Sequence, residues 1–258
     1  MQPRCNIAIE GATLPVRDFD RLYRATSQPV VIRNATFHSS ADYRARTTIP
    51  ALVESVGEAS VTLSSANAFS YGRRKMSVAQ YLSEALGPDA RAAWAADADG
   101  MAANLFYWFG EHGEELKALI SGYPLPRYAR PGALLSFAAV ASSGSAAASP
   151  SAAPTDAPPA LSFGVGPDGS GVPFHFHNDG FSEVLHGAKH WLLYPQKPPR
   201  FRENATSVSW LLNDYPQLSW RERPYECHIG PGDLLYFPKG WWHAIVNVGE
   251  TVFMSTFL

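Results

Sequence analysis

The chain has 258 residues, of which 46% are hydrophobic and 17% charged, and its formal net charge at pH 7 is −2. This balance supplies enough apolar side chains for a core, excludes a largely disordered chain and disfavours a nucleic-acid-binding surface spread over the molecule. No segment has the roughly 20 consecutive apolar residues of a membrane-spanning helix, and the first residues, MQPRCNIAIEG, lack the apolar run of a signal peptide. From these features alone we expect a globular, cytoplasmic protein with no membrane span and no nucleic-acid partner.

Residues 1–137 are expected to form an elaboration of helices and strands in front of the main β structure. Apolar residues recur at helical spacing in segments 14–25 and 76–86, which predicts two short helices. Runs of β-branched and aromatic residues predict strands at 29–35, 60–71 and 104–109. We expect the last of these, NLFYWF, to pack in the core rather than to bind a ligand.

Residues 138–160, AAVASSGSAAASPSAAPTDAPPA, consist almost wholly of alanine, serine and proline. Such a segment cannot bury enough apolar surface to offset the entropy cost of ordering it, so it predicts a flexible surface insertion. A linker between two domains would have a similar composition, but neither flank resembles a complete domain. We therefore expect a single domain over residues 1–258, with the core barrel strands in residues 161–258.

The C-terminal part contains many short segments of strand length separated by Gly, Pro, Asn or Asp. They are 161–166, 172–177, 181–187, 189–195, 226–230, 233–238, 243–248 and 251–258. This spacing predicts a mainly β fold, either a sandwich or a jelly roll.

The two cysteines, Cys5 and Cys227, are separated by nearly the whole chain. They are either two unrelated free thiols or the ends of one disulfide, and a disulfide would require an oxidising compartment. Two Asn-x-Thr glycosylation acceptor patterns, at Asn34 and Asn204, agree with the second alternative.

Six of the eight histidines lie between His175 and His243. His175 and His177 are two residues apart and would share one face of a strand. Asp179 would share that face if the strand continued, but the sequence NDG predicts a turn there. His243 follows a Pro turn and two tryptophans, at the expected mouth of a barrel. Two histidines and a carboxylate arranged in this way are typical of a non-haem iron(II) site.

The chain resembles the Jumonji-C (JmjC) family of the cupin superfamily. The motifs that carry the resemblance are PVVIRNA, GPDGSGVPFHFHNDG, FSEVLHGAKHWLLYPQ and GPGDLLYFPKGWWHAIVNVG. The resemblance implies a double-stranded β-helix that binds iron(II) and 2-oxoglutarate and hydroxylates or demethylates protein side chains. It also implies a protein substrate or protein partner.

The resemblance assigns the first metal histidine to His175 and the distal one to His243. It assigns Lys189 to the lysine that binds the distal carboxylate of 2-oxoglutarate. The motif departs from the family at His177, which stands where the family has Asp or Glu, so either His177 itself or Asp179 would complete the metal site. It departs again at Val172, where active members commonly have a threonine that helps to hold the co-substrate.

Two functions follow from these residues and departures. The first is an iron(II)- and 2-oxoglutarate-dependent protein oxygenase with an atypical metal site. The second is a catalytically degenerate protein-binding or scaffold module. The branch of the family with the most similar motifs implies the lumen of the endoplasmic reticulum as the location, in conflict with the cytoplasmic expectation. We expect a monomer.

Overall fold

The computed structural model describes residues 5–65, 72–86, 105–129, 158–203 and 205–258. Within these residues the strands form one 10-stranded sheet in the order β1-β2-β9-β7-β10-β6-β5-β3-β4, and β8 pairs with β7 off this path. The strands are β1 (Ala8–Glu10), β2 (Val30–Ile32), β3 (Ser60–Ser65), β4 (Arg73–Ser77), β5 (Phe106–His112), β6 (Ala160–Gly166), β7 (Gly180–Tyr194), β8 (Tyr225–Ile229), β9 (Leu234–Phe237) and β10 (Trp242–Phe257).

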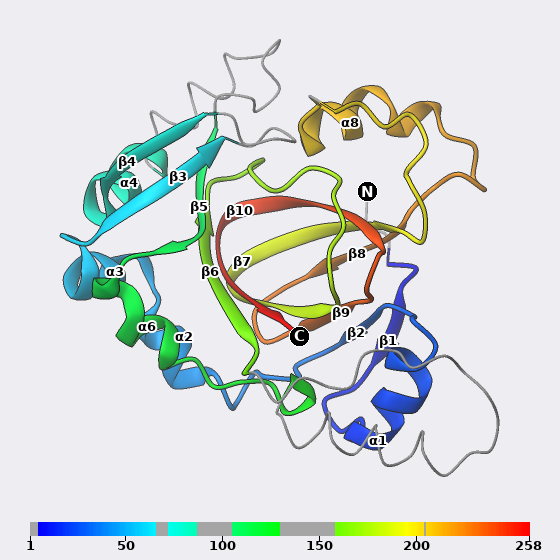
Figure 1. The fold of residues 1–258 in the computed structure, drawn as a ribbon, viewed down its shortest axis with the longest axis horizontal. Coiled ribbons are helices and arrows are strands. Elements are labelled where there is room, and N and C mark those ends of the chain that lie inside the picture. The colour runs from blue at the N-terminus through cyan, green and yellow to red at the C-terminus, as the bar shows by residue number, and fades with distance from the viewer. Residues whose placement is uncertain (1–4, 66–71, 87–104, 130–157, 204) are drawn as a thin grey trace.

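The sheet curls around a packed interior, and its strands are antiparallel except for the β1–β2 pair. The longest strands, β7 and β10, lie side by side across the centre of the molecule (Figure 1). One end of β7 pairs with β9 and the other with β8, so that two further strands extend the wall of the barrel. The prediction of a mainly β jelly roll with N-terminal helices and strands is confirmed.

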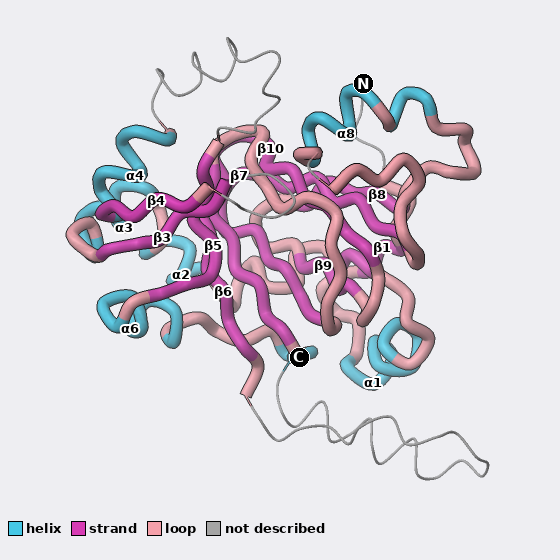
Figure 2. The backbone as a smooth tube through the Cα atoms, turned by 45° about the horizontal axis from the view of Figure 1, so that its top comes forward, coloured by secondary structure: helices cyan, strands magenta, loops and turns pink. Residues whose placement is uncertain are grey.

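The helices lie around the periphery of the barrel (Figure 2). They are α1 (Val16–Phe19), α2 (Ala41–Arg46), α3 (Ile49–Val56), α4 (Val78–Ala85), α6 (Lys117–Ser121) and α8 (Ser207–Asn213). Helices α2, α3, α4 and α6 gather beside β3, β4 and β5, where the largest group of buried apolar side chains lies (Figure 1). No helix in the described part of the chain is long and apolar enough to cross a membrane.

The N-terminal predictions hold in outline and fail at their boundaries. The expected helix at 14–25 is α1 followed by a single π-helical turn, Asp20–Arg24. The expected helix at 76–86 begins at Val78, because the two residues before it complete β4. Within the aromatic segment 104–109, Trp108 is fully buried, as expected for a core strand. Residues 66–71 of one expected strand, and nearly all of the expected insertion at 138–160, lie outside the described residues.

Four of the C-terminal segments that the sequence divides are two continuous strands. Segments 181–187 and 189–195 form β7, and segments 243–248 and 251–258 form β10. Gly187 and Gly249 both have positive φ, which bends each strand without ending its pairing. The segment 172–177 is not a regular strand, and only His175 forms an isolated bridge, with His243.

Cys5 and Cys227 form a disulfide, so the alternative of two free thiols is wrong. Cys227 is fully buried in β8, and the bond fastens the start of the described chain to the barrel wall. Backbone hydrogen bonding continues the attachment, because the Asn6 N–H donates to the Glu226 carbonyl at 3.0 Å. The Arg33 guanidinium lies beside the bond, with Nη2 3.2 Å from Cys227 Sγ.

Candidate metal centre

Three histidine side chains meet inside the barrel at one end of β10. His175 and His177 lie in the segment that leads into β7, and His243 is the second residue of β10. The backbones of His175 and His243 exchange two hydrogen bonds of 3.0 and 2.8 Å, which hold the two segments together. One ring nitrogen from each of the three histidines lies within 4.8 Å of the other two.

Each of the three imidazoles is held by a backbone carbonyl near its Nδ1. The contacts are His175 to Pro173 O at 2.7 Å, His177 to Asn178 O at 2.6 Å and His243 to Trp241 O at 2.9 Å. A carbonyl can only accept, so each Nδ1 carries the proton and donates it, and each neutral ring presents an Nε2 lone pair. The Nε2 atoms of His177 and His243 are 3.1 Å apart, and as two acceptors they have no proton to share. A cation bound between them would satisfy both lone pairs.

Burial keeps these imidazoles uncharged. It lowers the pKa of His175 to about 4, lowers the pKa of His177, and holds the pKa of His243 well below its ordinary value. Aromatic rings form the surrounding wall: Phe237 stacks on His243 at 5.1 Å between ring centroids, and Phe257 meets His177 edge-on at 5.0 Å. The three rings are therefore in the neutral state that binds a divalent metal, in a site where His243 is buried and His175 and His177 are partly exposed.

The two carboxylates near this site point elsewhere. Asp179 accepts a hydrogen bond of 3.2 Å from the hydroxyl of Tyr236, which belongs to an apolar cluster outside the barrel with Phe19 and Phe181. Glu183 is fully buried on the outer face of β7, where it accepts hydrogen bonds from Ser40 and Tyr123. Among the described residues, the group of side chains that could hold a metal consists of the three histidines. That His175, His177, Asp179 and His243 bind metal stays a prediction.

Lys189 lies on β7 and faces the barrel interior, two residues before the buried Trp191. It is 4% exposed, and in the described part of the chain no hydrogen bond reaches its Nζ. The Nζ atom lies 2.9 Å from the centroid of the Phe253 ring and 5.9 Å from that of Trp191. Burial without a counter-anion holds the pKa of Lys189 well below its ordinary value.

Other polar atoms on the same inward face are buried without a hydrogen-bond partner among the described residues. They are Ser182 Oγ, Trp191 Nε1 and Asn247 Oδ1. Buried polar atoms left in this state are costly, and one explanation for them is a polar ligand that completes their hydrogen bonding. The residues present therefore fit a divalent metal at the histidines and an anion at Lys189. Val172, by contrast, packs with the interior apolar side chains and offers no hydroxyl to such an anion.

The sequence reading missed two inward residues, Asn247 and Phe253. A period of two along β10 counted from His243 places both on the histidine's face, so the signal was present. The turn signal at Gly249, which predicts two separate strands, hides this alternation.

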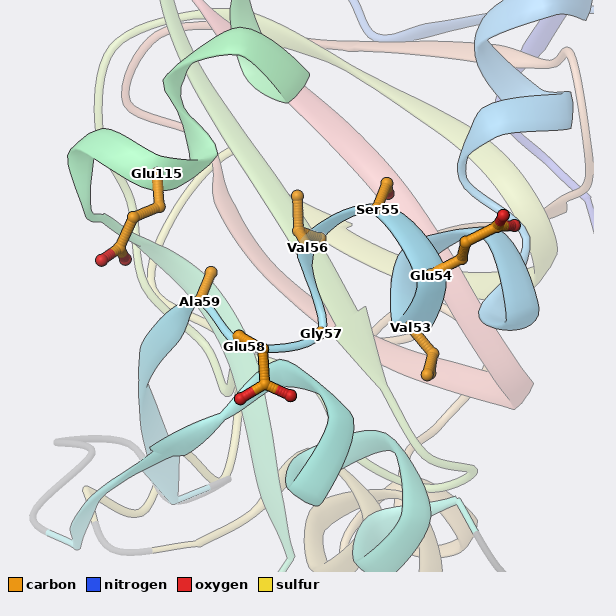
Figure 3. Close-up of a pocket in the computed structure, with 8 residues that line it drawn as sticks. All are labelled: Val53, Glu54, Ser55, Val56, Gly57, Glu58, Ala59 and Glu115. Carbon is orange, nitrogen blue, oxygen red and sulfur yellow. The ribbon is translucent and has the colours of Figure 1, made fainter.

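An open pocket of 410 Å³ lies away from the barrel, at the turn after α3 (Figure 3). Its charged side chains are Glu54, Glu58 and Glu115, and the Glu54 carboxylate points away from the other two (Figure 3). The carboxylates do not converge on one point, so this pocket is not a second metal centre.

The cupin-like domain model matches residues 16–257 of this chain. JmjC domain-containing protein 8 of Homo sapiens is 36% identical to it, over 100% of this chain and 85% of the human protein. Two further relatives match shorter stretches. The bifunctional arginine demethylase and lysyl-hydroxylase psr-1 of Caenorhabditis briggsae is 32% identical over 37% of this chain and 28% of its own length. The 2-oxoglutarate and iron-dependent oxygenase JMJD4 of Danio rerio is 31% identical over 34% of this chain and 24% of its own length. The chain belongs to the JmjC family of cupin-like proteins.

Proposed function

We propose that this protein is an iron(II)- and 2-oxoglutarate-dependent protein oxygenase of the hydroxylase class, with a metal site made of three histidines. The observation that carries the proposal is the convergence of three neutral imidazoles whose Nδ1 atoms are each tied to a backbone carbonyl. The name of the Danio rerio relative records the use of iron and 2-oxoglutarate by that protein. The name of the Caenorhabditis briggsae relative records action on arginine and lysine, which supports a protein substrate here.

In this proposal, bound iron(II) and 2-oxoglutarate supply the activation of dioxygen for hydroxylation of a C–H bond. The protein's own residues bind and orient these groups. His175, His177 and His243 hold the metal, and the carbonyls behind them fix their orientation. A neutral ligand set leaves the full charge of a divalent ion in the site, where a family-type carboxylate would cancel part of it, and this favours an anionic co-ligand. Lys189 is the residue that receives the distal carboxylate of that co-ligand.

The second candidate function is a catalytically degenerate JmjC protein that serves as a protein-binding or scaffold module. The Phe253 ring against Lys189 and the apolar Val172 both favour it, because each weakens the site for a co-substrate carboxylate.

We also propose that the protein works in the lumen of the endoplasmic reticulum. The disulfide between Cys5 and Cys227 supports an oxidising compartment, and the acceptor residue Asn34 is exposed. Intact mass of protein purified from its native source tests this location: the oxidised form is lighter by two hydrogens than the form treated with reductant. A reduced pair in the native protein would count against it.

The oxygenase proposal is tested by loading the purified protein anaerobically with iron(II), measuring the bound metal, and following succinate after oxygen and 2-oxoglutarate are added. We expect one iron per chain and succinate formation, and we expect His243→Ala to lose both. His38→Ala is the matched control, because His38 is an exposed histidine outside the site. Iron uptake without succinate in the unmodified protein would favour the scaffold function, and equal uptake by His243→Ala would overturn the metal site itself.

A further inference from the structure

We propose that Phe253 is a specificity-determining residue that covers Lys189 and must move before a dicarboxylate can bind there. The inference rests on the proposed function, because it concerns the co-substrate subsite of the same barrel.

The ring of Phe253 lies directly on the lysine. Its centroid is 2.9 Å from Nζ, which is also the distance at which an ammonium group donates to a carboxylate oxygen. The ring and a carboxylate therefore cannot occupy the same side of Nζ. The other sides are closed as well, since Lys189 is 4% exposed and is paired in the sheet with both Asn247 and Ile229.

The position of the ring depends on a glycine in the neighbouring strand. Phe253 of β10 pairs with Gly164 of β6, and a Cβ atom placed at Gly164 would overlap the Phe253 ring. Phe109, on β5, also pairs with Gly164 and lies 5.4 Å from Phe253 between ring centroids. The absence of a side chain at 164 thus lets the Phe253 ring fill the interior beside Lys189, while Phe109 packs behind it.

The polar atoms around this ring indicate what its movement would expose. Asn247 lies directly opposite Lys189 on β10, and its Oδ1 has no partner among the described residues although its Nδ2 donates to Ser170. Trp191 Nε1, on the same face of β7 as Lys189, also lacks a partner there. A dicarboxylate that displaced the Phe253 ring would place a carboxylate oxygen where Lys189 Nζ can donate to it. It would also bring a hydrogen-bond acceptor close to Trp191 Nε1.

The experiment measures equilibrium binding of 2-oxoglutarate by dialysis, under anaerobic conditions, with and without Mn²⁺. The variants are Phe253→Leu and Phe253→Met, because an apolar side chain of similar volume is tolerated in a core better than alanine. Phe109→Leu is the matched control, since it removes an inward phenylalanine that is not on the lysine. We expect both Phe253 variants to lower the dissociation constant about tenfold, equivalent to about 1.4 kcal/mol, and Phe109→Leu to leave it unchanged.

Adding Lys189→Met to the Phe253→Leu variant is expected to abolish the gain, which identifies the lysine as the group uncovered. Unchanged or weaker binding by both Phe253 variants, with thermal unfolding as cooperative as in the unmodified protein, would overturn the inference. So would an equal gain in Phe109→Leu. Failure of the proposed function gives a different result: the unmodified protein and all variants would fail to bind Mn²⁺, whereas the comparison of 2-oxoglutarate affinities without metal would still decide the role of Phe253.

Discussion

The His177 side chain contacts His243, whereas the Asp179 side chain contacts Tyr236, and this difference predicts that His177 completes a metal site. The His177 ring has its Nε2 3.1 Å from that of His243, whereas the Asp179 carboxylate is engaged with Tyr236 outside the histidine cluster. We expect His177→Ala to weaken Zn²⁺ binding by more than about 100-fold, beyond the effect typical of a residue that only supports a ligand. Asp179→Ala should change it by only a few-fold.

Competition titration against a chelator of known affinity gives both values. Asp179→Asn is the paired control, because it keeps the acceptor for the Tyr236 hydroxyl while removing the charge. A larger loss from Asp179→Asn than from His177→Ala would reverse the assignment and place the carboxylate on the metal.

A second prediction concerns acid stability and the histidine pair on the outer face of the barrel. The rings of His190 and His228 are partly exposed, and their centroids lie 4.3 Å apart across β7 and β8. Burial, and then the nearby His190, lower the pKa of His228 to about 4. In the unfolded chain the same group titrates near its ordinary value of about 6.5.

The sign follows from proton uptake. Below pH 6.5 the unfolded chain binds a proton at His228 that the folded chain does not bind. The free energy of unfolding therefore decreases as the pH is lowered from 6.5 to about 4, below which the folded state is protonated as well. We expect His228→Gln to show a smaller drop in melting temperature between pH 7 and pH 4.5 than the unmodified protein. The exposed His38→Gln should retain the full drop. An unchanged drop in His228→Gln would contradict the assignment.

At the scale of elements, the disulfide joins the segment before β1 to β8 across 222 residues of sequence. In the chain-entropy model a cross-link of this span stabilises the fold by about 5 kcal/mol. We therefore expect Cys5→Ser to lower the melting temperature by about 10–20 °C, at the few degrees per kcal/mol usual for a chain of this size. Calorimetry with and without a phosphine reductant checks this: the reductant should lower the melting temperature of the unmodified protein but not that of Cys5→Ser. An equal effect of reductant on both would show that the bond contributes nothing.

The bend of β7 at Gly187 is a feature that the sequence does not predict. Strand patterning and motif order predict the segments that form β6 to β10, and they single out His175 and His243 as candidate ligands while leaving the choice between His177 and Asp179 open. Strand patterning does not predict that the Glu183 side chain lies on the outer face of β7. Val184 points inward before Gly187, and Lys189 points inward after it, although they are five residues apart. The bend at Gly187 therefore reverses the alternation, and a glycine in a sequence does not say whether a strand ends there or continues.

Helices α2 and α3 were missed for a different reason. Thr48 caps α3 by accepting a hydrogen bond from the Ala51 N–H, and Pro50 occupies its first turn, so the local start signal was present. Short helices of this kind form because Tyr43 and Leu52 pack against the sheet, and that tertiary contact is not encoded in the local pattern.

At the scale of the whole molecule, the histidines and Lys189 face the same barrel interior. On the β7–β10 pair His243 lies opposite Leu193 and Lys189 lies opposite Asn247, and the Trp191 ring centroid is 5.7 Å from that of His243 and 5.9 Å from the lysine Nζ. Two uncompensated sites buried in one barrel cost folding free energy in the protein without ligands. Metal binding should therefore be visible as added stability of the whole fold.

Ligand linkage gives the size of this effect. A metal present at 100 times its dissociation constant adds about 2.7 kcal/mol to the free energy of unfolding, or about 5–10 °C in melting temperature for a chain of this length. We expect Zn²⁺ to raise the melting temperature of chelator-treated protein by this amount, and we expect no rise in His243→Ala. His38→Ala should respond like the unmodified protein, since it retains the three histidines of the site. A rise of equal size in His243→Ala would mean that the metal binds elsewhere, because an apolar residue at 243 leaves two histidines that cannot enclose the ion.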